Sequence, residues 1–300
     1  MMTTTTRAAL LGIDFGSKFT KVALVKPGVP FQIVTNTASK RKTSSMVGLT
    51  SEGERLYAGD ADNYIKRKPQ EVFAYSKNLL GRTKNHPEIS RVSENLIDQH
   101  TLLSDDSRHG SIQVLNVHGK DDDNEDEDVE EKSKNSHLRQ AFSSEELASF
   151  VLSYARDIGE TEAKTQIKDV CITVPSFFTQ AERQAVLDAA SIAKLNVLAL
   201  VDENVAAAIQ FGVDRVFENK TNVMFYNMGA VSTQVTIAQY SSRITKRLGS
   251  NVTSSVFSIL SKSWDESLGG SYFDMRIANS LADHFNELVR KKTGSKDYDV

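Results

Sequence analysis

The chain has 300 residues, of which 39% are hydrophobic and 25% charged, and its formal net charge is -3. This composition is typical of one large or two modest globular domains, and a single cysteine, Cys171, excludes a small disulfide-stabilised protein. The stretch from Asp121 to Glu131 holds nine acidic residues, so the remainder is slightly basic without a clustered basic stripe. We therefore find no case for nucleic-acid binding, and no stretch reaches the roughly 18 apolar residues of a membrane span.

Two strands joined by a tight glycine turn open the chain. Ala8 to Phe15 and Phe19 to Val25 are β-rich runs on either side of Gly16. Phe31 to Val34 predicts a third strand. Pro69 to Leu80 predicts a helix that ends at Gly81.

The acidic run follows a short strand expected at Ile112 to Val117. Like charges in such density repel one another, so we interpret 121–131 as a solvated loop. Loose calcium binding is a weaker alternative, because the run lacks the spaced ligands and turn glycine of an EF-hand.

Two capping boxes mark helix starts. Ser143 with Glu146 predicts a helix that continues to near Gly159, and Thr179 with Glu182 predicts one that continues to about Ala193. Strands and a helix alternate around these two helices. We expect strands at Asp169–Val174, Leu195–Val201 and Asn222–Met228, with a short helix at Val205–Phe211 ended by Gly212. This alternation predicts an α/β fold with a mixed sheet.

The last part of the chain repeats the opening pattern. Ser232 to Gln239 is a further expected strand, with Val256 to Leu260 as a partner, and Tyr272 to Val289 carries helical spacing. Strand, glycine turn and strand thus occur both at Leu10–Val25 and at Val223–Ala238. Two such turns that face each other would hold a polyphosphate through main-chain N–H groups.

The residues around the first turn suit that chemistry. Asp14 lies at a strand end where it could hold a metal-bound water, Ser17 offers a hydroxyl and Lys18 a positive charge. The second turn has Asn227 and Gln234 where carboxylates would be wanted. Ordinary hairpins remain the alternative at both turns.

Four other residues have ordinary structural interpretations beside functional ones. Lys77 would be a surface lysine on a helix, and Glu203 an acid at a helix N-terminus. Pro175 would end a strand, and Arg183 would be a surface base. From residues alone the prediction reaches an α/β phosphate-binding fold and no further.

Five blocks nevertheless resemble the 70-kDa heat-shock chaperone family, in the order of that family. They are LGIDFGSKFTKVAL, FAYSKNLLGR, the run from DVCITVPSFF to AAIQFGV, MFYNMGAVSTQVTI and SWDESLGGSYFDMRIA. Within the family, SKRKTSS, ITVPSFFTQAER and FYNMG are most similar to the 170-kDa glucose-regulated branch of the endoplasmic reticulum.

The resemblance implies an actin-like, ribonuclease H-like ATPase fold of two lobes that close over ATP or ADP with Mg. Residues 1–216 would form the first lobe, with an inserted subdomain at about 47–142 that contains the acidic loop. Residues 217–300 would form the first part of an incomplete second lobe, and the chain would be a piece of a longer protein.

The resemblance also implies roles for individual residues. Lys77, Asp14 and Glu203 would be catalytic, with Asp14 and Glu203 holding the metal through water, and Pro175 and Arg183 would relay the nucleotide state. The nucleotide would be held by Gly16, Ser17, Lys18, Phe19, Asn227, Gly229, Ala230, Val231, Ser232, Gly269 and Gly270.

Several residues differ from the pattern of the resembled family, and these differences bear on the rate of ATP hydrolysis. Asn227 and Gln234 replace aspartates, Ala230 and Val231 replace glycines, and Lys18 replaces a threonine. We therefore expect ATP binding with slow hydrolysis. The function implied is a chaperone or a nucleotide-exchange co-chaperone of a conventional 70-kDa chaperone, acting on unfolded clients in the endoplasmic reticulum lumen, with the cytoplasm as the alternative. A sugar kinase or filament ATPase of the same fold is the remaining alternative.

Overall fold

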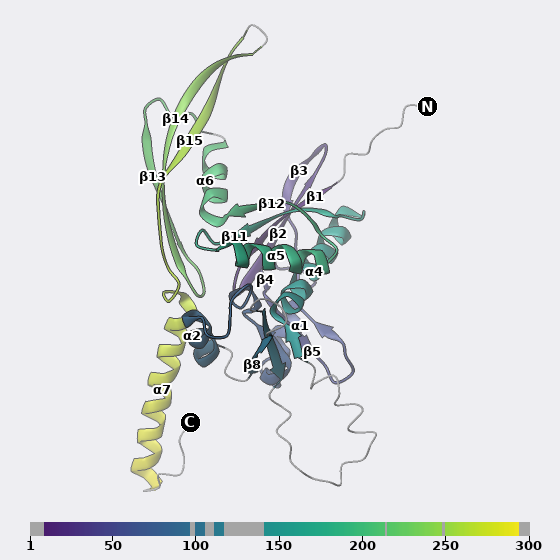
Figure 1. Cartoon of the computed structure of the whole chain (residues 1–300), viewed down its shortest axis with the longest axis vertical. Coiled ribbons are helices and arrows are strands. Elements are labelled where there is room, and N and C mark those ends of the chain that lie inside the picture. Colours follow the sequence, from purple (N-terminus) through teal and green to yellow (C-terminus); the bar gives the residue numbers. More distant parts are fainter. Residues whose placement is uncertain are drawn as a thin grey trace.

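The computed structural model describes residues 9–96, 100–105, 111–116, 141–213, 215–247 and 250–293. The acidic run at 121–131 lies outside the described residues. Figure 1 shows a central sheet covered by helices, a long hairpin sheet beside it and a helix that extends from the end of that hairpin. The described chain is α/β with mixed sheets, as the alternation of strands and helices predicted.

The central sheet has the order β12-β11-β1-β2-β3, and β4 also pairs with β2. Its strands are β1 (Leu10–Phe15), β2 (Phe19–Lys26), β3 (Val29–Ile33), β4 (Thr43–Ser44), β11 (Asp169–Val174) and β12 (Asn196–Asp202). β1 and β2 are antiparallel across the Gly16 turn, whereas β1 pairs with β11, and β11 with β12, in parallel. Parallel strand ends therefore meet at one edge, where the polar residues after them gather.

Two helices, α4 (Ser144–Ala163) and α5 (Gln180–Ile192), supply apolar side chains to the same core as this sheet. Leu11 and Ile13 alternate with exposed or half-buried residues along β1 and are almost fully buried. Both predicted capping boxes are present. In the first, the Ser143 hydroxyl accepts from the Glu146 N–H at 3.1 Å, and the Ser143 N–H donates to the Glu146 carboxylate at 2.8 Å.

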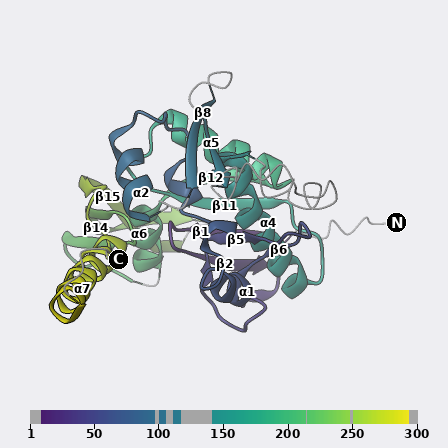
Figure 2. The ribbon, with the colours of Figure 1, turned by 90° about the horizontal axis from the view of Figure 1, so that it is seen from below.

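A second core lies beside the central sheet and joins two small sheets. Their strands, in the orders β6-β5-β7 and β10-β9-β8, are β5 (Met46–Leu49), β6 (Arg55–Leu56), β7 (Val72–Ala74), β8 (His100–Asp105), β9 (Ser111–Asn116) and β10 (Ala141–Ser143). The helices of this region are α1 (Ala58–Tyr64), η1 (Pro69–Glu71), η2 (Ser76–Asn78) and α2 (Pro87–Leu96). Figure 2, seen from below, shows α1 and α2 apart from each other, and Figure 1 shows both at the lower end of the central sheet.

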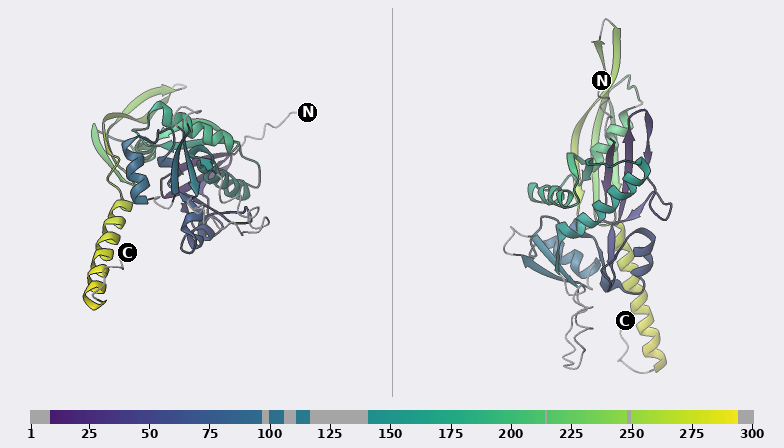
Figure 3. Two further views of the ribbon diagram at one scale, coloured as in Figure 1. Left: turned by 60° about the horizontal axis from the view of Figure 1, so that its bottom comes forward. Right: turned by 90° about the vertical axis from the view of Figure 1, so that its right-hand side faces the viewer.

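The third part is an antiparallel sheet of β13 (Thr221–Met228), β14 (Thr233–Arg247) and β15 (Ser250–Asp265), on which α6 (Glu203–Val213) packs. The sheet leads into α7 (Gly270–Thr293). Figure 3 shows α7 extending away from the sheets, and its apolar stripe, which includes Phe273, Ile277 and Leu281, is exposed.

The prediction of a helix at Pro69–Leu80 was wrong. This segment forms two short 3-10 turns, η1 and η2, with strand β7 between them. The reason is tertiary pairing: Val72 and Phe73 are buried and pair with β5, which overrides helical spacing. Tyr75 then adopts φ 57°, which ends the strand and turns the chain toward Lys77.

Two helices end later than predicted, because the glycines expected to end them instead allow close packing inside the helix. The helix expected to stop near Gly159 continues to Ala163, since a Cβ at Gly159 would lie 2.8 Å from the Leu11 side chain. Gly212 is likewise inside α6, where its missing side chain makes room for the Tyr240 ring. The strands expected at 232–239 and 256–260 are longer and include most of the polar stretch between them.

Candidate functional site

A cleft of about 470 Å³ lies where the central sheet, the η2 turn and the β13–β14 hairpin meet. Most of the predicted site residues line it, namely Asp14, Gly16, Ser17, Lys18, Phe19, Lys77, Pro175, Glu203, Asn227, Gly229, Ala230, Val231, Ser232 and Gly270. Gly269 and Arg183 are not among the lining residues; the Arg183 guanidinium instead donates to the Phe178 carbonyl at 2.9 Å. The fold therefore brings together predicted site residues that lie more than 200 positions apart in the sequence.

Both glycine turns border the cleft. The first turn (Gly16–Phe19) connects β1 to β2, and a Cβ at Gly16 would lie only 2.4 Å from the Phe19 carbonyl oxygen. The second turn (Gly229–Ser232) connects β13 to β14 and is closed by the Gly229 N–H, which donates to the Ser232 carbonyl at 2.8 Å. Backbone this close to the cleft is the geometry that suits a bound anion.

The β15–α7 junction holds the second turn in place. The Gly270 N–H donates to the Gly229 carbonyl at 2.9 Å, and the Ser271 N–H donates to the Ala230 carbonyl at 2.8 Å. A Cβ at Gly269 would lie 2.4 Å from the Ala230 carbonyl oxygen, so only glycine fits there. Gly269 thus supports the turn without lining the cleft.

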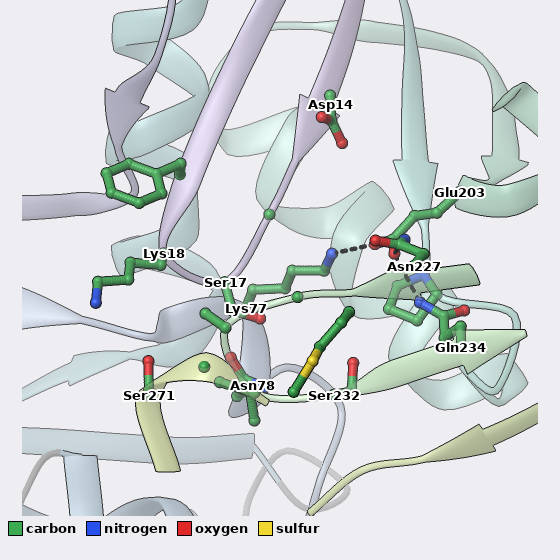
Figure 4. A pocket seen from close by; sticks show the side chains of 18 of the residues that line it. Asp14, Ser17, Lys18, Lys77, Asn78, Glu203, Asn227, Ser232, Gln234 and Ser271 are labelled. Atoms are coloured by element: carbon green, nitrogen blue, oxygen red, sulfur yellow. Dashed lines mark hydrogen bonds and ion pairs between the residues drawn. The ribbon is translucent and has the colours of Figure 1, made fainter. Parts of the chain in front are cut away.

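Lys77 is the clearest departure from the surface interpretation. Its side chain is only 4% exposed, because Tyr75 and η2 turn the chain so that the ammonium faces the cleft. The ammonium donates to Glu203 Oε1 at 2.7 Å and to the Phe15 carbonyl. Figure 4 shows this contact crossing from η2 to the start of α6.

Glu203 is bound by two side-chain amides as well. Gln234 Nε2 donates to Glu203 Oε2 at 2.7 Å, and Asn227 Nδ2 donates to the same oxygen at 3.4 Å. Gln234 is 2% exposed, and its Oε1 accepts from the N–H and the hydroxyl of Ser176 at 2.9 and 2.8 Å. Ser176 was not predicted, although its place directly after Pro175 at a strand end was a usable signal.

Asp14, the other predicted metal-shell residue, is half exposed. It accepts from Lys21 at 3.4 Å and from the Thr173 hydroxyl at 3.2 Å. Within the described part of the chain, no group of three or more Asp, Glu, His or Cys residues is arranged to hold a metal ion. With Asn227 and Gln234 donating N–H groups to Glu203, this donor set fits a magnesium shell poorly, and the assignment of Asp14 and Glu203 to metal stays a prediction.

Val231 is the least expected feature of the second turn. Its side chain is 3% exposed and packs in the second core with Val47, Phe73 and Leu79. The Val231 side chain therefore packs into a hydrophobic core, and the residue also lines the cleft. This packing joins the hairpin sheet to the body of the protein.

Three polar contacts add to that connection. Arg82, 5% exposed, lies between the carboxylates of Glu182 on α5 and Glu266 after β15. Although burial opposes it, these two carboxylates hold the pKa of Arg82 above its usual range. The Tyr75 and Ser271 hydroxyls lie 3.0 Å apart, and Lys18 pairs with Asp274 at 3.3 Å in an exposed position.

No helix in the described ranges is both long and apolar enough to cross a membrane. The Hsp70 protein family matches residues 10–298. The chain is 37% identical over 291 residues to hypoxia up-regulated protein 1 of Xenopus laevis, covering 96% of this chain and 41% of that protein. It is 37% identical over 292 residues to the protein of the same name from Homo sapiens and 36% over 296 residues to that of Danio rerio, covering 96% and 98% of this chain. The chain spans 26% and 28% of those two relatives.

Proposed function

We propose, from the premise that this chain belongs to the Hsp70 protein family, that it binds ATP and ADP in the cleft and hydrolyses ATP slowly. Hsp70 proteins bind adenine nucleotides with magnesium and bind client proteins. The finer assignments are part of the proposal: two actin-like lobes divided near residue 216, with the cleft between them, and Pro175 and Arg183 as relay residues. The match supports this function over a sugar kinase or a filament ATPase of the same fold.

One observation carries the slow turnover. The amides of Asn227 and Gln234 are hydrogen-bonded to Glu203, and the Gln234 oxygen is bonded to Ser176. An amide has no carboxylate that could act as a general base, so neither position can take a proton from the attacking water molecule. Binding depends instead on main-chain N–H groups and lysines, which are retained.

The cellular role follows from the relatives. Their name refers to up-regulation by hypoxia, and we propose that this chain is part of a stress-responsive chaperone of the endoplasmic reticulum lumen. Its proposed partners are unfolded clients and a conventional 70-kDa chaperone, whose nucleotide exchange it would accelerate. An exchange factor does not need rapid hydrolysis of its own, which agrees with the amide substitutions.

The test has three measurements with the purified 300-residue chain. Calorimetry should detect ATP binding, and a single-turnover assay should give slow hydrolysis that rises at least about tenfold in the Asn227→Asp, Gln234→Asp variant. Release of labelled ADP from a conventional 70-kDa chaperone should accelerate when the chain is added. A folded chain that binds no ATP and leaves ADP release unchanged would refute the proposal.

A further inference from the structure

The charges that line the cleft are already paired. Four lysines border it, and three of them each contact a carboxylate: Lys77 with Glu203 at 2.7 Å, Lys18 with Asp274 at 3.3 Å, and Lys21 with Asp14 at 3.4 Å. These three carboxylates are the acidic residues among those that line the cleft. A divalent cation commonly neutralises excess carboxylate and phosphate charge, and here lysines neutralise the carboxylates.

The fourth lysine, Lys42, forms no ion pair with a carboxylate among the described residues. It lies 3.9 Å above the centre of the Phe19 ring, beside the first turn. A cation held on an aromatic face keeps most of its hydrogen-bonding capacity for a further ligand. Lys42 and Lys18 therefore both place positive charge beside the first turn.

The orientation of the Gln234 amide is determined by its neighbours. The Ser176 N–H can only donate and the Glu203 carboxylate can only accept, so the amide oxygen must face Ser176 and the nitrogen must face Glu203. At the position where an oxygen would attract a metal-bound water, the site thus has N–H groups. This side of the cleft disfavours a cation.

Building on the nucleotide site proposed above, we propose that the cleft binds the polyphosphate of a nucleotide as its metal-free anion. The Lys18–Asp274 and Lys21–Asp14 pairs are exposed, so they are weak and a phosphate can take the place of the acid. Lys77 stays with Glu203, because both groups are largely buried and a phosphate would have to break a short ion pair. The affinity for ATP then does not require magnesium.

The test is a calorimetric titration of the whole 300-residue chain with ATP, once with excess magnesium and once with excess EDTA. Inorganic tripolyphosphate in EDTA serves as a second probe that reports on the phosphate contacts alone. We expect dissociation constants for ATP that agree within about threefold, and binding of tripolyphosphate in EDTA. Binding in magnesium that weakens more than about tenfold in EDTA would overturn this inference and leave the nucleotide site intact. No binding under either condition would overturn both proposals.

A pair of variants makes the result specific. Asn227→Asp with Gln234→Glu places carboxylates beside Glu203, and we expect ATP binding in EDTA to weaken at least about tenfold relative to magnesium. Gln239→Glu is the matched control, because it lies on the same strand at an exposed hydrogen bond with Asn222, and it should leave both constants unchanged. Equal magnesium dependence in the double variant and the parent would contradict the inference.

A second substitution tests the phosphate contacts and leaves the buried hydrogen bonds of Glu203 with Lys77 and Gln234 in place. Lys18→Ala removes an exposed side chain at the first turn, and we expect it to weaken tripolyphosphate binding in EDTA by about fivefold. Lys220→Ala, at an exposed position next to β13, should have no effect. Unchanged binding in Lys18→Ala would contradict a site in which lysines replace the metal ion.

Discussion

Gln234→Glu changes one amide nitrogen to an oxygen at the best-defined point of the cleft. The side chain is 2% exposed, and the replaced atom lies 2.7 Å from Glu203 Oε2. Two ionised carboxylates repel each other at such a contact, so at low pH the introduced carboxyl keeps its proton and donates it to Glu203, and it ionises only at a higher pH than usual. Its pKa in the folded state should therefore rise well above the unfolded value of about 4.3.

The magnitude follows from that rise in pKa. A rise of about two units corresponds to a loss of about 2.7 kcal/mol in the free energy of unfolding once the pH exceeds the folded pKa. Below the unfolded pKa the neutral acid reproduces the amide hydrogen bond, so the variant should be close to the parent. The loss should therefore develop between about pH 4 and pH 7 and then stay constant.

Urea unfolding from pH 4 to pH 8, followed by tryptophan fluorescence, measures this. Trp264 is the single tryptophan; it pairs with Gln234 between β14 and β15, and its ring centroid lies 6.2 Å from that of Phe177, which lines the cleft, so its signal reports on this region. Gln239→Glu is the control and should change the free energy of unfolding by less than about 0.5 kcal/mol at every pH. A loss in Gln234→Glu that is independent of pH, or equal to that of the control, would refute the reasoning.

Two further predictions concern the second core. Val231→Ala should lower the free energy of unfolding by about 2 kcal/mol, because it leaves a cavity between the second turn and that core, whereas Val256→Ala at an exposed position of β15 should have little effect; urea unfolding distinguishes them. Tyr272→Phe should be neutral or stabilise by up to about 1 kcal/mol, because the buried hydroxyl has no hydrogen-bond partner among the described residues. Burial also raises the pKa of Tyr272 to about 12. The parent should therefore lose stability from about pH 10 to pH 12 and the variant less, as thermal unfolding in alkaline buffers would measure; equal losses would contradict this role.

Local patterns in the sequence determined much of the fold. The Ser143–Glu146 and Thr179–Glu182 capping boxes predicted two helix starts, because such caps satisfy N–H groups within a few residues of the chain. The Gly16 turn and the later Gly229 turn predicted two hairpins, and the resemblance to Hsp70 proteins identified many of the residues that line the cleft. The family assignment was confirmed over nearly the whole chain.

Tertiary contacts decided what those residues do. Lys77 was expected on a helix that does not form, and its burial depends on the pairing of β7 with β5. Gln234 could be recognised in the sequence as an uncharged substitute, but its bonds to Ser176 and Glu203 join segments 58 and 31 residues apart. Val231 was predicted as a residue of the nucleotide site, and its side chain also packs into a core built from other elements. Each outcome depends on which surfaces meet when the sheets pack, and no local spacing carries that information.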